Sequence, residues 1–185
     1  SITPVTASTS FAVYFQEPIY GLNLDWEDSL DVLFELQDFF GTAVFAISIE
    51  RDNTYGLVAF FTERGQFASF QLQYPASEKA HISLIQDKAS DEIVAAELIR
   101  TFMMGFGLDA VLTQLEQLKL VHFGEFTFHH LFADQVGKAA IIEVGEEENE
   151  VIFNEDQFIV MTNFKNSSFR DVPYDQVTGE GADRY

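Results

Sequence analysis

The sequence contains no cysteine, which excludes a disulfide framework and thiolate metal sites. Basic residues are also scarce, because 10 Lys and Arg stand against 30 Asp and Glu, giving a formal charge of −20. So acidic a surface argues against nucleic acids and anionic membranes as partners. The lack of cysteine fits a reducing compartment, and we expect a cytoplasmic protein.

Long hydrophobic runs are missing as well. No apolar stretch reaches the roughly 18 residues that a membrane-spanning helix needs. The first seven residues carry neither the basic end nor the apolar centre of a signal peptide. We therefore expect residues 1–7 to be a leader peptide or an expression remnant.

Apolar residues are nevertheless plentiful. They make up 47% of the 185 residues and include 20 Phe, so the chain can bury a substantial core. The sequence shows no internal repeat, linker or low-complexity tract. We expect one domain over residues 8–185.

The first half of the chain predicts an antiparallel meander. Two apolar runs flank Glu17-Pro18 and indicate a β-hairpin. Later runs alternate with period two or are wholly apolar, as in strands. For residues 29–36 a short helix from Ser29 is the alternative to a strand. The expected strands cover residues 7–14, 20–26, 32–36, 43–50, 55–62 and 66–73.

The second half predicts two helices followed by more strands. Ser90 resembles an N-cap before acidic residues, and apolar residues then recur at helical spacing up to Met103. A second helix is expected over residues 109–118. Strands are expected over residues 125–132, 138–144, 150–153 and 158–161. The order sheet, helix pair, sheet predicts a layered α+β domain of two antiparallel sheets with helices packed outside.

A run of small hydroxyl residues opens the first strand, with Ser8 among them. A hydroxyl nucleophile there, with the carboxylate of Asp25 one strand away, suits chemistry on an amide. The alternative is that these serines and threonines form a solvated lead-in to an ordinary strand.

Other motifs favour structural roles. His129 and His130, with Asp134, suggest a metal site, but adjacent residues on a strand point to opposite faces. The glycines at 179 and 181 lack the Lys-Ser/Thr of a phosphate loop. We therefore expect no metal and no cofactor.

Three separated segments together resemble the linear amide carbon–nitrogen hydrolases of the N-terminal-nucleophile (Ntn) superfamily. This group includes choloylglycine hydrolases, penicillin V acylases and isopenicillin-N acyltransferase. The first segment joins residues 8–11 (STSF) to 21–26 (GLNLDW). The second joins 130–143 to 160–164 (VMTNF), and the third is 179–185 (GEGADRY).

The resemblance implies a four-layer α-β-β-α sandwich and a catalytic set. In the family, removal of a leader frees an N-terminal Cys, whose α-amine acts as the base. Ser8 stands at the position of that Cys, with residues 1–7 as the leader. Asp25 matches the residue that positions the amine, and Asn163 matches an oxyanion-hole residue. Arg184 matches an Arg beside the nucleophile. The implied activity is hydrolysis or acyl transfer on a small amide with an apolar acyl group.

The chain departs from the family pattern at several points. The nucleophile is Ser instead of Cys, and Leu22 stands where many relatives have Arg. Residues 53–57 only loosely match Asn-Glu-x-Gly-Leu, the leader is attached, and the chain stops at Tyr185, which suggests an incomplete domain. Three explanations are open. Ser8 could be an engineered replacement of Cys, the lineage could have lost its activity, or the sequence could be only part of the natural protein.

These departures leave a second hypothesis open. A non-catalytic relative could keep the sandwich and bind a small ligand or a partner subunit. The sequence does not distinguish a monomer from a homo-oligomer.

Overall fold

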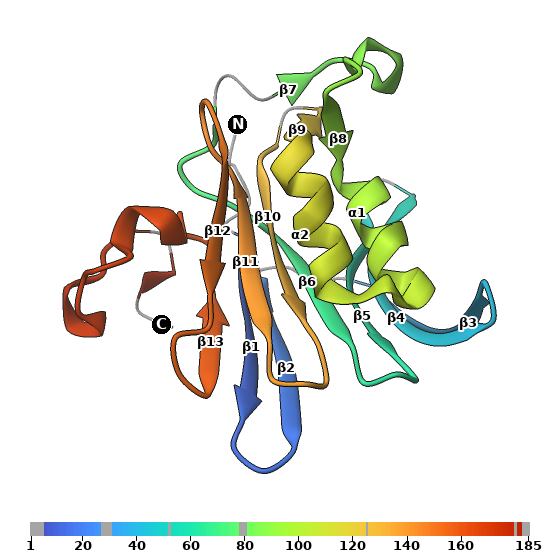
Figure 1. The fold of residues 1–185 in the computed structure, drawn as a ribbon, viewed down its shortest axis with the longest axis horizontal. Coiled ribbons are helices and arrows are strands. Elements are labelled where there is room, and N and C mark those ends of the chain that lie inside the picture. The colour runs from blue at the N-terminus through green and yellow to red at the C-terminus, as the bar shows by residue number, and fades with distance from the viewer. Residues whose placement is uncertain are drawn as a thin grey trace.

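The computed structural model describes residues 6–26, 31–51, 53–77, 81–124, 126–179 and 181–182. Within these residues, two antiparallel sheets of seven and three strands face each other, and helices cover the outer face of the larger sheet (Figure 1). Alternate side chains of a strand point to opposite faces. The central strands of the larger sheet therefore supply two cores at once.

The larger sheet has the order β12-β11-β10-β6-β5-β4-β3. Its strands follow one another as hairpins within each half of the chain, and the pairing of β10 with β6 joins the two halves. The strands are β3 (Val32–Phe39), β4 (Thr42–Arg51), β5 (Thr54–Thr62), β6 (Phe67–Leu72), β10 (Phe128–Ala133), β11 (Ala139–Val144) and β12 (Asn149–Phe153).

The smaller sheet has the order β13-β1-β2, from β1 (Thr6–Tyr14), β2 (Pro18–Trp26) and β13 (Phe158–Met161). Its register pairs Ser8 with Leu24, Phe11 with Gly21, and Ser10 with Met161. The ring of Phe11 occupies the space that a Cβ at position 21 would need, which explains glycine there.

The helical layer lies between the two halves of the larger sheet in sequence. It consists of α1 (Ala95–Thr101), the π-helical η2 (Phe102–Phe106) and α2 (Gly107–Gln117). Gly105 has φ +82° and allows the chain to turn between the helices. In the described part of the chain, no helix is long and apolar enough to cross a membrane.

A third, short sheet extends the helical layer at one end. Here β9 (Lys119–Phe123) pairs in parallel with both β7 (His81–Ile82) and β8 (Glu92–Val94). Single-turn 3₁₀ helices complete the fold, namely η1 (Ile85–Asp87), η3 (Asn166–Phe169) and η4 (Tyr174–Gln176).

The core divides into two hydrophobic clusters. One lies between the helices and the larger sheet, where Phe60, Phe102 and Phe132 are fully buried. The other lies between the two sheets, where Ala12, Ala59 and Leu131 are fully buried. Among the described residues, the cluster between the sheets contains four buried alanines, whereas the cluster on the helical side contains four buried phenylalanines.

Most expected strands are confirmed, including the hairpin and the strand that begins at Val32. The N-cap at Ser90 is wrong, because residues 92–94 form β8 and α1 begins only at Ala95. The carboxylate of Glu97 caps that helix by accepting from the Val94 N–H at 3.0 Å. Strand β9 is absent from the sequence-based expectation.

The α+β class is confirmed, and the described residues contain three of the four expected layers. In them, the α-helices cover only the larger sheet, and no α-helix covers the outer face of the smaller one, where Tyr174 of η4 contacts Phe158 of β13. The sequence pattern placed the helix pair correctly between the two runs of strands along the chain. The two runs do not form separate sheets, because each contributes strands to both sheets.

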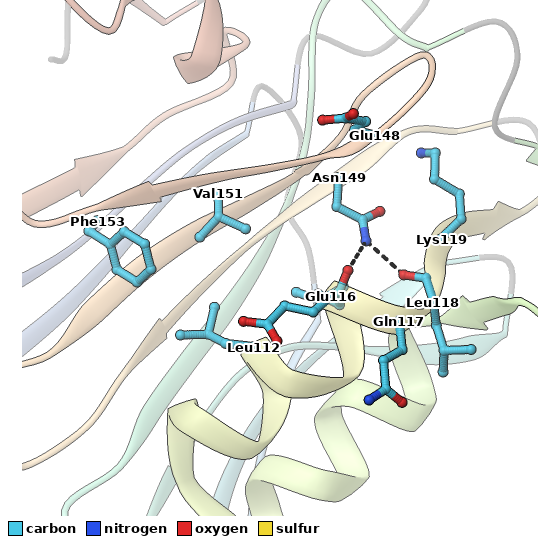
Figure 2. Close-up of a pocket in the computed structure, with 10 residues that line it drawn as sticks. Leu112, Glu116, Gln117, Leu118, Lys119, Glu148, Asn149, Val151 and Phe153 are labelled. Carbon is cyan, nitrogen blue, oxygen red and sulfur yellow. Dashed lines mark hydrogen bonds between the residues drawn. The ribbon is translucent and has the colours of Figure 1, made fainter.

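One side chain ties the helical layer to both sheets beside it. A surface pocket of about 560 Å³ separates α2 from β12, and Asn149 lies at one end of it (Figure 2). The Asn149 Nδ2 donates to the carbonyls of Leu115 at 2.9 Å and Leu118 at 2.7 Å. Its Oδ1 accepts from the Leu120 N–H at 2.8 Å. Asn149 therefore fixes both the end of α2 and the start of β9.

We expect Asn149→Ala to lower the free energy of unfolding by about 2–3 kcal/mol, because it removes three partly buried hydrogen bonds. Urea denaturation followed by circular dichroism measures the change. Glu148→Ala, at an exposed neighbouring position, is the matched control and should stay within about 0.5 kcal/mol of the parent. Equal stability of the two variants would contradict the assigned role.

Candidate active site

The head of β1 is held against the larger sheet by the side chain of Asn163. The Ser8 N–H donates to the Asn163 Oδ1 at 2.9 Å, and the Asn163 Nδ2 donates to the Leu72 carbonyl at 2.8 Å. Ser8 is buried, with only 7% exposure. One side-chain amide thus connects the first strand of the smaller sheet to β6 of the larger one.

Next to Ser8, a buried polar network replaces the apolar contacts between the sheets. The Ser69 hydroxyl donates to the Ser10 Oγ at 2.7 Å, and both residues are fully buried. Gln71 completes the network when its amide is oriented to satisfy both ends. Its nitrogen then donates to the carbonyls of Ser8 at 3.0 Å and Thr162 at 3.2 Å, and its oxygen accepts from the Ser10 N–H at 3.1 Å. The polar network fixes the backbone that follows Ser8.

The segment that carries Asn163 is anchored by a buried carboxylate. Glu143 on β11 accepts from the N–H groups of Asn166 at 2.6 Å and Ser167 at 2.9 Å. It also accepts from the ring Nδ1 of His129 at 3.1 Å, and both of these side chains are completely buried. Backbone hydrogen bonds between Tyr74 and residues 163 and 165 secure the same segment from the other side. Hydrogen bonds on both sides therefore hold the segment that carries Asn163 in place.

The charge of Glu143 is stabilised by its partners. Burial by itself would raise the pKa of this carboxyl. The hydrogen bond and charge of His129 and the hydrogen bonds from Ser167 outweigh burial and lower the pKa to about 2. Glu143 is thus ionised throughout the physiological range.

The structure describes three of the four site residues expected from the sequence, and two of these three meet. Ser8 and Asn163 are in direct contact. Asp25 is exposed and lies on the opposite face of the hairpin, because it pairs with Ala7 while Ser8 pairs with Leu24. Arg184 lies outside the described residues.

Leu22 also has a structural explanation. It lies on the inner face of β2, opposite Ser10, and packs against the apolar cluster between the sheets. Where relatives of this pattern carry a cation, this chain therefore has an apolar contact.

The pair His129 and Glu143 was missed as part of the site. The sequence contained a signal for it, since Glu143 interrupts an otherwise apolar strand, and a charge in such a strand needs a buried partner. His129 was considered only as a metal ligand with Asp134. The expectation that His129 and His130 face opposite ways is confirmed by their different neighbours.

Comparison with known proteins supports the fold. Two variant forms of the conjugated bile acid hydrolase from Clostridium perfringens match with TM-scores of 0.61 and 0.63, each at 16% identity. The matches cover 91% and 92% of this chain but 60% of each hydrolase chain. Penicillin V acylase from Agrobacterium tumefaciens matches at a TM-score of 0.43 and 13% identity, over 96% of this chain and 53% of its own. No protein-family model and no curated protein matches the sequence.

The domain therefore has the fold of the conjugated bile acid hydrolase, which is an Ntn-hydrolase fold. The resemblance seen in the sequence is confirmed at the level of the fold. The chain spans about 60% of the length of the two hydrolase structures.

The depressed pKa of Glu143 predicts a specific pH dependence. Between about pH 4.5 and pH 2 the unfolded carboxyl takes up a proton while the native one does not, so stability should fall as the pH falls through this window. The contribution of this group is about 3 kcal/mol in total. In Glu143→Gln, denaturation curves measured from pH 5 to pH 2 should show a smaller loss, and stability at pH 7 should be lower than in the parent.

Glu150→Gln is the matched control for this experiment. Glu150 lies opposite Glu143 on the neighbouring strand but is partly exposed and pairs with Arg170 at the surface. Its replacement should leave the acid limb of the stability curve close to that of the parent. An unchanged acid limb in Glu143→Gln would refute the role given to the buried carboxylate.

Proposed function

We propose that this domain is an amide hydrolase of the N-terminal-nucleophile type, in a precursor or disabled form, with Ser8 as nucleophile. Its substrate would be a small molecule with a linear amide bond and an apolar acyl group. The observation that carries the proposal is the hydrogen bond from the Ser8 nitrogen to the Asn163 side chain, buried where the two sheets meet. The likeness of the fold to a bile acid hydrolase supports it.

Activation would begin with a step inside the chain. The Ser8 Oγ attacks the carbonyl carbon of residue 7, the bond from that carbon to the Ser8 nitrogen breaks, and the hydroxyl proton passes to the nitrogen. Water then hydrolyses the ester and releases the preceding residues. The Ser8 nitrogen becomes a free amine within reach of the Asn163 Oδ1.

The free amine would then serve as the general base. It takes the proton of the Ser8 hydroxyl as the oxygen attacks the substrate carbonyl, and it returns the proton to the leaving amine. Asn163 Oδ1 would orient the amine, and the resemblance assigns the oxyanion to the same side-chain amide. Asp25 pairs with residue 7, so in the strand register it lies one position from the new amine.

A specific observation favours the non-catalytic alternative. Leu22 packs into the apolar cluster between the sheets, and the polar network ties the Ser8 carbonyl to Gln71. A site that has replaced a cation with a core contact could have kept only the capacity to bind a small ligand.

Ser8→Cys separates the two functions. For the enzyme we expect loss of residues 1–7 from the intact mass, because a thiolate is the stronger nucleophile near neutral pH. We also expect release of a chromogenic amine from simple N-acyl amides. A stable mass and no turnover at any pH would favour the binding protein.

Ser10→Cys is the matched control, since Ser10 is buried on the same face of β1 two residues further along. It should show neither processing nor turnover. A second variant, Ser8→Cys with Asn163→Ala, should lose most of the activity of Ser8→Cys, by about 100-fold or more. Full activity without the Asn163 amide would contradict the proposed geometry.

A further inference from the structure

A second cavity lies on the face of the larger sheet opposite to Ser8. It has a volume of about 300 Å³ and lies between that sheet, α1 and β9. His130 points to this side because it alternates with His129 and Leu131 along β10. The apolar part of the lining includes Leu57, Phe70, Val94 and Ile99.

Two buried imidazoles contribute to the wall of this cavity. His122 is 4% exposed and His130 is 2% exposed, and their ring centroids are 6.3 Å apart. Within the described part of the chain, the His122 Nε2 and both ring nitrogens of His130 have no hydrogen-bond partner. Buried polar atoms nearly always have a partner, and each one left without costs about 1–3 kcal/mol.

The neighbouring histidine shows the contrast. His81 packs against His122 with ring centroids 5.6 Å apart, but its nitrogens contact the Gly124 carbonyl at 2.7 Å and the Thr127 hydroxyl at 3.0 Å. His129, on the other face of the sheet, lacks a partner among the described residues only at Nε2, because its Nδ1 bonds to Glu143. Of the described histidines near the cavity, His81 is therefore satisfied, whereas His122 and His130 leave ring nitrogens without a partner.

Both lining imidazoles are neutral near pH 7. Burial, with a smaller contribution from His81, lowers the pKa of His122 to about 3, and burial holds the pKa of His130 well below its usual value. A neutral imidazole offers one donor and one acceptor. A hydroxyl group complements such a pair, because it can donate to one ring and accept from the other over bonds of about 2.9 Å.

We propose that this cavity binds a small, uncharged aromatic molecule that carries a hydroxyl group, with the hydroxyl between His122 and His130. An aromatic ring fits the remainder of the lining, and a dry cavity of about 150 Å³ is already enough for benzene. A carboxylate is disfavoured because both imidazoles are neutral and the chain carries a formal charge of −20. The site is separate from Ser8 and independent of amide hydrolysis.

The test uses 4-methylphenol as the probe and 4-methylanisole as its matched analogue, which cannot donate a hydrogen bond. Titration of the full chain, followed by ¹⁵N NMR of the histidine rings, should move the resonances of His122 and His130 and leave those of His129 in place. The methyl ether should bind about tenfold more weakly, the equivalent of one lost hydrogen bond. Equal affinities, or no shift at millimolar probe, would overturn the proposal.

Two variants test the hydrogen bond and the position of the probe separately. His130→Phe retains a ring of similar shape but removes one hydrogen bond to the hydroxyl, so it should weaken the phenol about tenfold. Ala95→Leu adds side-chain volume to the cavity lining while both histidines are kept, so it should abolish binding of both probes. Thr113→Leu, on the exposed side of α2, is the matched control and should bind as the parent does. Undiminished binding in Ala95→Leu would place the probe elsewhere and refute the site.

Discussion

The amide of Asn163 is the interaction on which the candidate active site depends. It accepts from β1 and donates to β6, so it sets the spacing of the two sheets at the end where Ser8 lies. Its own position depends on Glu143, a buried anion that holds the following residues by two backbone N–H groups. Burying the charge of Glu143 costs desolvation free energy, and the hydrogen bonds from its partners offset this cost. Together these contacts fix the position of the Ser8 nitrogen.

Strand β10 connects this geometry to the cavity behind it. His129 faces the space between the sheets and pairs with Glu143, whereas His130 faces the helices and lines the second cavity. Two adjacent residues thus serve opposite sides of one sheet, as the period of a strand requires. A ligand on the helical side would touch the strand that supports the site without entering it.

Period-two alternation and turn residues were sufficient to predict most of the sheets, because those strands bury one or both faces. They failed at residues 92–94, where β8 forms, and at residues 119–123, where β9 forms. These short segments gain their stability from parallel pairing with each other, which no local pattern reveals. Ser8 and Asn163 were found through motif resemblance, since their contact spans the whole domain. Glu143 and His129 needed the register of β10 and β11 to be recognised as a pair.

Leu22 stands where many proteins of the resembling family carry an Arg, so this position brings no positive charge to the site. Its apolar contact between the sheets supplies no charge to a developing oxyanion or to the hydroxyl of Ser8. While Ser8 is joined to residue 7, its nitrogen is a neutral amide that can only donate to Asn163. Under the proposed function, cleavage would convert that same atom into a base that the Asn163 amide already contacts. If the proposed function holds, release of the residues before Ser8 would therefore create the base and its charge in a single event.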